Sequence, residues 1–311
     1  MVLNKMTQNT PEKPFLKIKN LSKTYRFSKN PALENIDLEI NEGDKIGLVG
    51  SNGSGKTTLL RLIMNYIKPD QGEIIVKGQT NLENVHHIIG FIGESQEGLE
   101  NFTPRELFSM AAKMHGINKK EATNRANELL EFSGLKDVAD NLIGSFSKGM
   151  AQRTFICSAI IHNPEILLLD EPMSGLDPQA QIDVKNFLGK LTNYTLLYAS
   201  HNFEEIEEYT FTVIFLHQGK IVQRLSLNDT DKEIFLLEID QDVKNFLNEF
   251  QHLNPKILDD KSENSKLQFI ADTKEFQEFI DYCKTKNVKI VKIRSRSILE
   301  DTYQKYIKNC L

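Results

Sequence analysis

The segment that decides the fold is Gly50-Ser51-Asn52-Gly53-Ser54-Gly55-Lys56-Thr57, which fits the pattern G-x-x-x-x-G-K-[ST]. The apolar run 45–49 before it predicts a short buried strand, and the run 58–63 after it predicts a helix. The glycines allow a tight turn in which backbone N–H groups and the helix N-terminus converge on one point, an arrangement that binds phosphate groups. The alternative is a glycine-rich turn that only caps a helix, but such a turn requires neither Lys56 nor Thr57.

A second motif is the apolar run that ends in two acids, Ile166-Leu167-Leu168-Leu169-Asp170-Glu171-Pro172. It predicts a central parallel strand whose carboxylates lie at the edge where open α/β sheets place their ligands. In phosphoryl transfer, Asp170 would hold Mg²⁺ through water and Glu171 would orient the attacking water. The alternative is that the two acids are only the solvated end of a strand, but this would leave the other motifs unexplained.

The segment Phe146-Ser147-Lys148-Gly149-Met150-Ala151-Gln152-Arg153 lies between these two motifs. Ser147 and Gly149 predict the start of a helix, whose free N–H groups would attract an anion. Ser147 can equally be an ordinary N-cap, and both functions use the same N–H donors. Further along, the predicted strand 195–199 leads into Ser200 and His201.

In this order, the motifs resemble the nucleotide-binding subunit of ATP-binding cassette (ABC) transporters over most of residues 15–224. The resemblance implies an α/β fold, the P-loop NTPase ABC cassette, with a mainly parallel central sheet, an antiparallel edge sheet and a helical subdomain at about 95–160. It also implies ATP hydrolysis, with ATP and Mg²⁺ bound. Each motif occurs once in the chain, so two copies would form a head-to-tail homodimer that sandwiches two ATP molecules.

The resemblance assigns a role to each matching residue. Catalysis falls to Glu171 and His201, and the aromatic that stacks on adenine is Tyr25. The phosphates would be bound by Gly50, Ser51, Asn52, Gly53, Ser54, Gly55, Lys56, Thr57 and Thr58. The ATP of the other subunit would be contacted by the signature residues Ser147, Lys148, Gly149 and Met150, while Asp177 would lie at the dimer interface. The implied Mg²⁺ ligands are Thr57, Asp170 and Glu94.

Three positions depart from the commonest family pattern. Lys148 replaces a second glycine, and Met150 replaces a glutamine. Lys148 either adds positive potential near the phosphate or is a solvated surface charge. Glu94 stands where a glutamine usually meets Mg²⁺, and Gln96 is the rival for that role. The Ser-Lys-Gly-Met variant resembles the ABC-2 type exporter branch, which includes sodium-exporter-like and drug-resistance ATPase subunits.

Composition limits the partners. The chain has 311 residues, of which 40% are hydrophobic and 26% charged, as expected of one large and one small globular domain. No stretch approaches the roughly 18 to 20 apolar residues that span a bilayer. The net charge of −5 argues against nucleic acid as a partner. We therefore expect a peripheral protein on the cytoplasmic side of the cell membrane. The family resemblance implies that it binds an ABC-2 type transmembrane permease subunit, with Glu97–Leu107 as the candidate contact strip; the alternative for this strip is an ordinary exposed loop and helix.

The domain organisation follows from pattern changes along the chain. Residues 1–14 predict a disordered tail, residues 15–224 the ABC ATPase domain and residues 228–231 a linker. Residues 232–311 predict a small α+β accessory domain. Its expected strands are 233–239, 266–270 and 288–293, and its expected helices are 241–250, 274–286 and 298–308.

Two other functional classes fit fewer of the residues. A soluble ABC ATPase acting on ribosomes or DNA usually carries two cassettes, a coiled-coil insert or zinc-binding cysteines. The three cysteines of this chain, Cys157, Cys283 and Cys310, have no such spacing. A degenerate cassette that binds ATP without turnover would not need Glu171 and His201.

Overall fold

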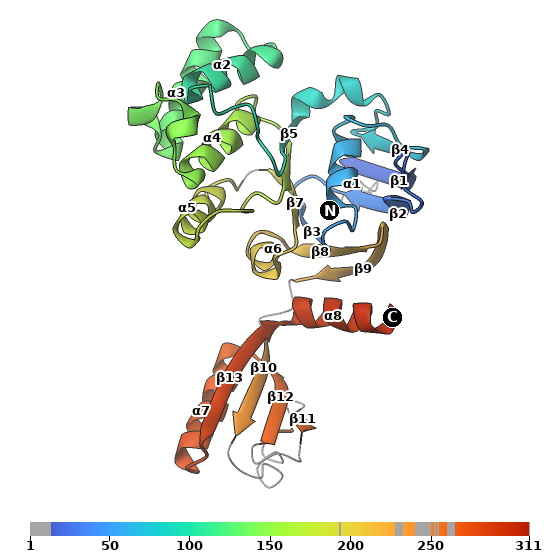
Figure 1. Cartoon of the computed structure of the whole chain (residues 1–311), viewed down its shortest axis with the longest axis vertical. Helices are drawn as coiled ribbons and strands as arrows, with labels where there is room; N and C mark the ends of the chain where they lie inside the picture. The colour runs from blue at the N-terminus through green and yellow to red at the C-terminus, as the bar shows by residue number, and fades with distance from the viewer. Residues whose placement is uncertain are drawn as a thin grey trace, which may run out of the picture. The chain divides into compact units, whose positions relative to one another are not determined.

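The computed structural model describes residues 14–192, 194–227, 233–239, 250–251, 253, 255–259 and 265–310 (Figure 1). The chain divides into two compact units, with the boundary between Ser226 and Leu227. Both the expected tail, except for Pro14, and the expected linker at 228–231 lie outside the described residues.

The first unit is built on a six-stranded sheet. Its strands, in spatial order, are β5 (Ile89–Ile92), β6 (Ile166–Asp170), β7 (Thr195–Ser200), β3 (Lys45–Val49), β8 (Thr212–His217) and β9 (Lys220–Ser226). All neighbours pair in parallel except β8 and β9, which are antiparallel. Every residue of β6 is buried, as expected of a central parallel strand. The parallel arrangement brings the ends of β3, β6 and β7 to one edge of the sheet.

A second, antiparallel sheet holds the first helix against the central one. It has the order β2 (Leu33–Ile40), β1 (Leu16–Lys23) and β4 (Gln71–Val76). Helix α1 (Lys56–Ile63) and both sheets share one hydrophobic core, to which Leu60, Ile18 and Leu168 contribute. Figure 1 shows α1 on the same side of the central sheet as β1, β2 and β4. The expected fold, an α/β cassette with an antiparallel edge sheet, is confirmed.

The remaining helices of this unit are α2 (Pro104–Met114), α3 (Lys119–Ser133), α4 (Lys148–Ile160), α5 (Pro178–Leu188) and α6 (Phe203–Tyr209). Figure 1 shows α2, α3 and α4 grouped together, and α4 also packs against α5. Helix α2 begins with a capping box: the Thr103 side chain accepts from the Glu106 N–H, and the Glu106 carboxylate accepts from the Thr103 N–H.

The second unit is a four-stranded antiparallel sheet with two helices. The strand order is β11 (Lys256–Asp259), β12 (Ser265–Ala271), β10 (Glu233–Ile239) and β13 (Ile290–Ser297). Helices α7 (Thr273–Thr285) and α8 (Ile298–Cys310) agree with two expected helices, while most of the expected helix 241–250 lies outside the described residues. The four-residue strand β11 is absent from the sequence-based prediction, and β13 continues past Ile293. A core that includes Phe235, Phe269 and Phe279 holds the unit together.

Candidate nucleotide site

The loop between β3 and α1 leaves the helix N-terminus open. Gly55, the N-cap residue of α1, has a φ of 114° and supplies no side-chain hydrogen bond to the first turn. A Cβ on Gly50 would lie 2.3 Å from the Leu216 carbonyl oxygen, so the backbone approaches too closely for any other residue. The first N–H groups of α1 therefore have no side-chain cap, and the helix dipole favours an anion at this end.

Lys56 connects this loop to the end of β6. Its side chain is only 6% exposed. Nζ donates a hydrogen bond to the Gly50 carbonyl oxygen over 2.7 Å and lies 3.2 Å from Glu171 Oε1. A buried ammonium group is thus held beside the open helix end, with a buried carboxylate as its counter-charge.

Asp170 is a buried carboxylate without a hydrogen-bond partner among the described residues. It is the last residue of β6, and neither Oδ1 nor Oδ2 has a partner. Its pKa is raised to about 6, mainly by burial and also by the nearby charges of Glu171 and Glu94, against the Thr57 hydroxyl and Lys56, which lower it. Orphaned carboxylate oxygens beside a hydroxyl and a second carboxylate are the hard oxygen donors that Mg²⁺ prefers. This donor set fits the expected metal ion.

Glu171 is held from two sides. Its φ is +48°, a left-handed backbone conformation that costs energy for a non-glycine residue and that recurs at functional sites. Its N–H donates to the Ala199 carbonyl oxygen over 2.8 Å. Its Oε2 lies 2.8 Å from His201 Nδ1 and accepts from the Ser200 hydroxyl over 3.2 Å. The turn after β6 therefore points this carboxylate at both Lys56 and His201.

The signature segment begins α4. Ser147 is its N-cap and accepts a hydrogen bond from the Met150 N–H over 3.3 Å. Gly149 is buried where α4 meets α5, because a Cβ there would lie 3.0 Å from the Cβ of Ala180. Lys148 Nζ donates to the Gly175 carbonyl oxygen over 2.8 Å. Lys148 is thus bonded to the loop that precedes α5.

The remaining expected site residues lie as follows. Asp177 is exposed and caps α5, accepting from the Ala180 N–H over 3.0 Å. The Tyr25 hydroxyl lies 3.3 Å from Thr58 Oγ1, and the Tyr25 side chain is 39% exposed beside α1. Glu94 is exposed, with its charge acting on Asp170. Its rival Gln96 instead donates its amide to the Gly93 carbonyl oxygen over 3.0 Å.

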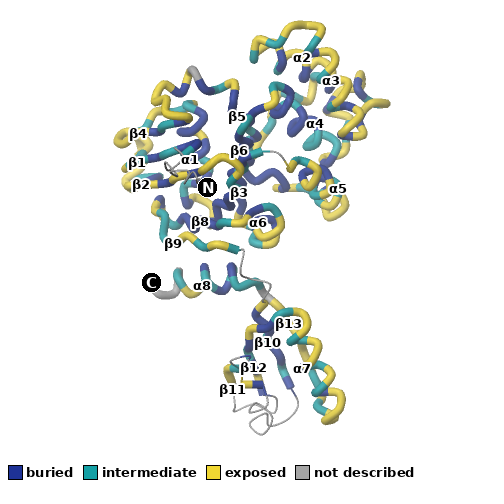
Figure 2. Tube along the Cα trace, turned by 180° about the vertical axis from the view of Figure 1, so that it is seen from behind, coloured by how far each residue is buried: buried dark blue, intermediate teal, exposed yellow. Residues whose placement is uncertain are grey.

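Two buried residues next to this site, Ser200 and Glu205, escape prediction from the sequence. Ser200 precedes His201 and is, by sequence, only the end of a strand. Glu205 lies in the acidic run Glu204-Glu205 at the start of α6. An acidic run at a helix start is usually solvated, but here Glu205 is buried while Glu204 is exposed. Figure 2 shows that other parts of α6 are exposed.

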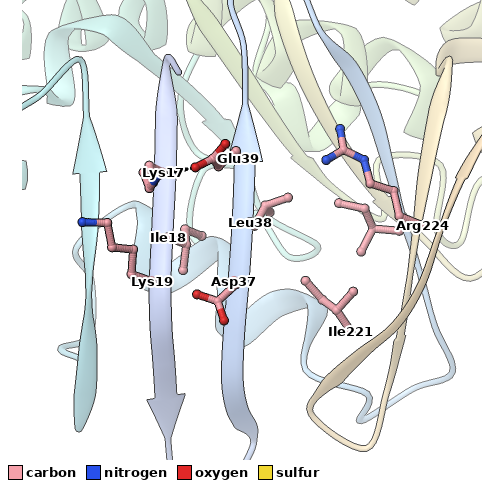
Figure 3. Close-up of a pocket in the computed structure, with 9 residues that line it drawn as sticks. Lys17, Ile18, Lys19, Asp37, Leu38, Glu39, Ile221 and Arg224 are labelled. Carbon is pink, nitrogen blue, oxygen red and sulfur yellow. Dashed lines mark ion pairs between the residues drawn. The ribbon is translucent and has the colours of Figure 1, made fainter. Parts of the chain in front are cut away.

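A separate groove contains none of these residues. Strands β1, β2, β8 and β9 line it with Lys17, Ile18, Lys19, Asp37, Leu38, Glu39, Ile214, Ile221 and Arg224 (Figure 3). Lys17 and Glu39 form an ion pair across it. Its floor is aliphatic and its rim is charged, without the open helix end that characterises the β3–α1 loop.

The fold and the open, lysine-bearing helix end define the class: this is a P-loop ATPase. The protein family described as "ABC transporter" matches residues 33–174. Bacitracin transport ATP-binding protein BcrA of Bacillus licheniformis is 34% identical over 250 residues, which is 74% of this chain and 81% of that protein. ABC transporter ATP-binding protein NatA of Bacillus subtilis (strain 168) is 34% identical over 202 residues, 63% of this chain and 82% of that protein.

Solved structures agree. The post-hydrolysis dimer of the ATP-binding cassette MJ0796, bound to ADP and phosphate, is 27% identical, covers 69% of this chain and 100% of its own, and has a TM-score of 0.62. The chain belongs to the family of ABC transporter ATP-binding proteins, and it hydrolyses ATP.

Proposed function

We propose that this chain is the ATP-hydrolysing subunit of an ABC-2 type exporter, working as a homodimer on a separate membrane permease. One observation carries the proposal. The uncapped N-terminus of α1, the buried ammonium group of Lys56 and the buried carboxylates of Asp170 and Glu171 converge at one edge of the sheet. That combination supplies donors for phosphate, ligands for a metal ion and a base for water.

Each residue at this edge then has a role. The N–H groups of residues 50–58 bind the phosphates, and Lys56 moves from Gly50 and Glu171 to the β and γ phosphates. Glu171 orients the attacking water, and His201 holds Glu171 in place through their 2.8 Å contact. Asp170, Thr57 and Glu94 hold Mg²⁺, which neutralises charge on the phosphates when it is bound.

The dimer follows from the position of the signature segment. Ser147 and Met150 lie at the start of α4, and the MJ0796 cassettes are dimers in their solved structures. In the proposed dimer, the N-terminus of α4 faces the phosphate that the partner copy binds. Tyr25 stacks on the adenine, and Asp177 lies at the interface, near the Gly175 loop that Lys148 already contacts.

The proposed permease contact is a cavity in the first unit, lined by the ends of α1, β5, α2 and α4. Two of the side chains that line it are largely exposed to solvent, Tyr66 by 61% and Met114 by 79%. The strip Glu97–Leu107 leads into α2 from β5. Large exposed apolar side chains beside a cavity suit a helix with an apolar face.

The transport role rests on the relatives, while the export direction and the membrane side are part of the proposal. The name of BcrA states bacitracin transport for that protein. None of the helices in the described ranges combines the length and apolar character that spanning a bilayer requires. On the proposed function, the chain binds peripherally at the cytoplasmic face, and the permease carries the cargo.

Co-purification from membranes tests this function. The tagged chain is solubilised in mild detergent after trapping with Glu171→Gln and ATP, and bound proteins are identified by mass spectrometry. We expect an integral membrane protein at a near-equal ratio, lost in a Met114→Glu variant that keeps its ATPase activity. Recovery of ribosomes or DNA, with no membrane protein, would contradict the exporter assignment.

A further inference from the structure

Glu205, a buried acid that the proposed reaction does not use, is linked to Glu171 through the hydroxyl of Ser200. The Ser200 Oγ is 3.2 Å from Glu171 Oε2 and 2.9 Å from Glu205 Oε2. It also accepts a hydrogen bond from the Asn202 N–H over 3.0 Å. Glu205 is 8% exposed, and its Oε2 accepts a further bond from the Tyr198 hydroxyl over 3.0 Å.

The hydroxyl of Ser200 lies within hydrogen-bond distance of two carboxylates but cannot donate to both. A serine hydroxyl has one proton, so it can donate to only one of two carboxylates at a time. If both acids are ionised, one buried negative oxygen loses this donor, and two like charges lie on either side of one hydroxyl. If Glu205 carries a proton, it donates to Ser200, and the Ser200 proton is free to bond to Glu171.

We infer that Glu205 is a positioning residue for ATP hydrolysis: in its protonated form it turns the Ser200 hydroxyl toward Glu171 and fixes that carboxylate beside Lys56 and His201. The inference rests on the role proposed above for Glu171. It explains how a residue in a strained left-handed conformation keeps one side-chain orientation, since Ser200 and His201 both bond to the same oxygen, Oε2.

The surroundings of Glu205 favour the neutral acid. Burial raises the pKa of Glu205, and the charge of Glu171 raises it further, while the Ser200 and Tyr198 hydrogen bonds and His201 lower it. Tyr209 on α6, whose ring stacks on Tyr198, is also near Glu205, and Glu208 lies beside Tyr209. On β3, Gly47 faces Ile206 of α6, and Lys45 lines one pocket with Tyr198, Glu208 and Tyr209.

The arrangement predicts how activity depends on pH. Because the pKa of Glu205 is raised, the neutral form persists above the ordinary range of a glutamic acid. As the pH rises through that raised pKa, Glu205 ionises, the Ser200 proton turns to it, and Glu171 loses a donor. The kcat of the wild-type protein should therefore fall as the pH rises through this pKa. The Glu205→Gln variant should not show this fall, because its amide donates a hydrogen bond at every pH.

Infrared spectroscopy of the nucleotide-free protein tests the protonation directly. In difference spectra against the wild type, which cancel the contribution of the other buried acid, Asp170, the carboxylic C=O band of a buried, protonated acid should be lost in Glu205→Gln and retained in the exposed control Glu204→Gln. An unchanged band in Glu205→Gln would overturn the inference. This readout does not depend on ATP turnover, so it separates a failure here from a failure of the proposed function.

Kinetics test the positioning role. We expect Glu205→Ala and Ser200→Ala each to lower kcat about tenfold, with KM for ATP within about twofold, the scale of losing a supporting hydrogen bond. The double variant should lose no more than either single one, because both act through one bond. Glu205→Gln should restore kcat to within about threefold of the wild type. If Glu205→Gln is as slow as Glu205→Ala, or if Glu205→Ala is as fast as the wild type while Glu171→Gln is inactive, the positioning role is refuted.

Discussion

The N-termini of α1 and α4 differ in what satisfies their N–H groups. Helix α1 begins after Gly55, which offers no side-chain cap. Helix α4 begins after Ser147, whose hydroxyl accepts from the Met150 N–H. The α1 end therefore depends on an external anion, while the α4 end is already satisfied within its own chain.

The charges around the two ends differ in the same way. Beside α1 lie Lys56, Glu171 and the unpartnered carboxylate of Asp170, all buried. Beside α4, the exposed Lys148 is bonded to the Gly175 carbonyl oxygen. On the proposed function, phosphate binding and hydrolysis thus belong to the α1 end. The α4 end can add an anion contact only when a phosphate arrives from outside to compete with Ser147.

The largest expected effect comes from the carboxylate at the α1 end. Glu171→Gln should slow ATP turnover by about a hundredfold or more, the scale of losing a positioned base, because an amide cannot accept the proton of water. Equilibrium ATP binding should persist, since Lys56 and the loop N–H groups remain. Turnover measured by phosphate release, together with nucleotide affinity, checks both parts. Unchanged turnover would show that Glu171, beside the N-terminus of α1, takes no part in ATP hydrolysis.

The next effect tests whether α4 acts across a dimer. Ser147→Arg should lower turnover by about a hundredfold, the lower end of the range seen when a donor to a developing charge is lost. ATP affinity of the isolated subunit should stay unchanged, because the blocked contact belongs to the partner's nucleotide. Titration of monomeric protein with a fluorescent ATP analogue measures that affinity. A collapse of monomer affinity would place α4 in the same site as α1.

These two ends also show what could be read from sequence. The β3–loop–α1 motif and the acidic end of β6 are local patterns, and their relative placement follows from the rule that parallel strands end at one edge. The Glu171 backbone conformation and the Ser200–Glu205 contact depend instead on how β7 pairs with β6 and how α6 packs against β7. The Lys148–Gly175 bond likewise joins the start of α4 to a loop that lies further along the chain. Local spacing carries no information on such contacts.

The unpartnered acid at the α1 end predicts a stability effect of unusual sign. The pKa of Asp170 is raised to about 6 from 3.8, so the folded state binds its proton more tightly than the unfolded state. The fold therefore loses stability as the pH rises between these values, and it stays less stable above them. Asp170→Asn should remove this cost and stabilise the nucleotide-free protein at pH 7.5 by about 3 kcal/mol.

Thermal unfolding without nucleotide measures this effect. We expect a Tm higher by roughly 6–12 °C, by the scaling of about 2–4 °C per kcal/mol for a domain of this size. The gain should shrink as the pH is lowered toward 5. Asp177→Asn is the matched control, because asparagine caps a helix as well as aspartate does. A lower Tm for Asp170→Asn at pH 7.5 would show that the carboxylate has a stabilising partner.

The smallest effect has the opposite sign, and it tests the capped end. Ser147→Ala removes the acceptor for the Met150 N–H and should destabilise the protein by about 1 kcal/mol, the usual cost of losing an N-cap. Ser147→Asn keeps a side-chain acceptor and should unfold within about 1 °C of the wild type. If ATP binding to a catalytically inactive dimer abolishes the stability difference between the Ser147→Ala variant and its parent, a phosphate satisfies the α4 N–H groups in place of the hydroxyl. A difference that persists in the ATP-bound dimer would show that Ser147 only caps its helix. The N-terminus of α4 would then have a structural role, while the N-terminus of α1 binds the nucleotide.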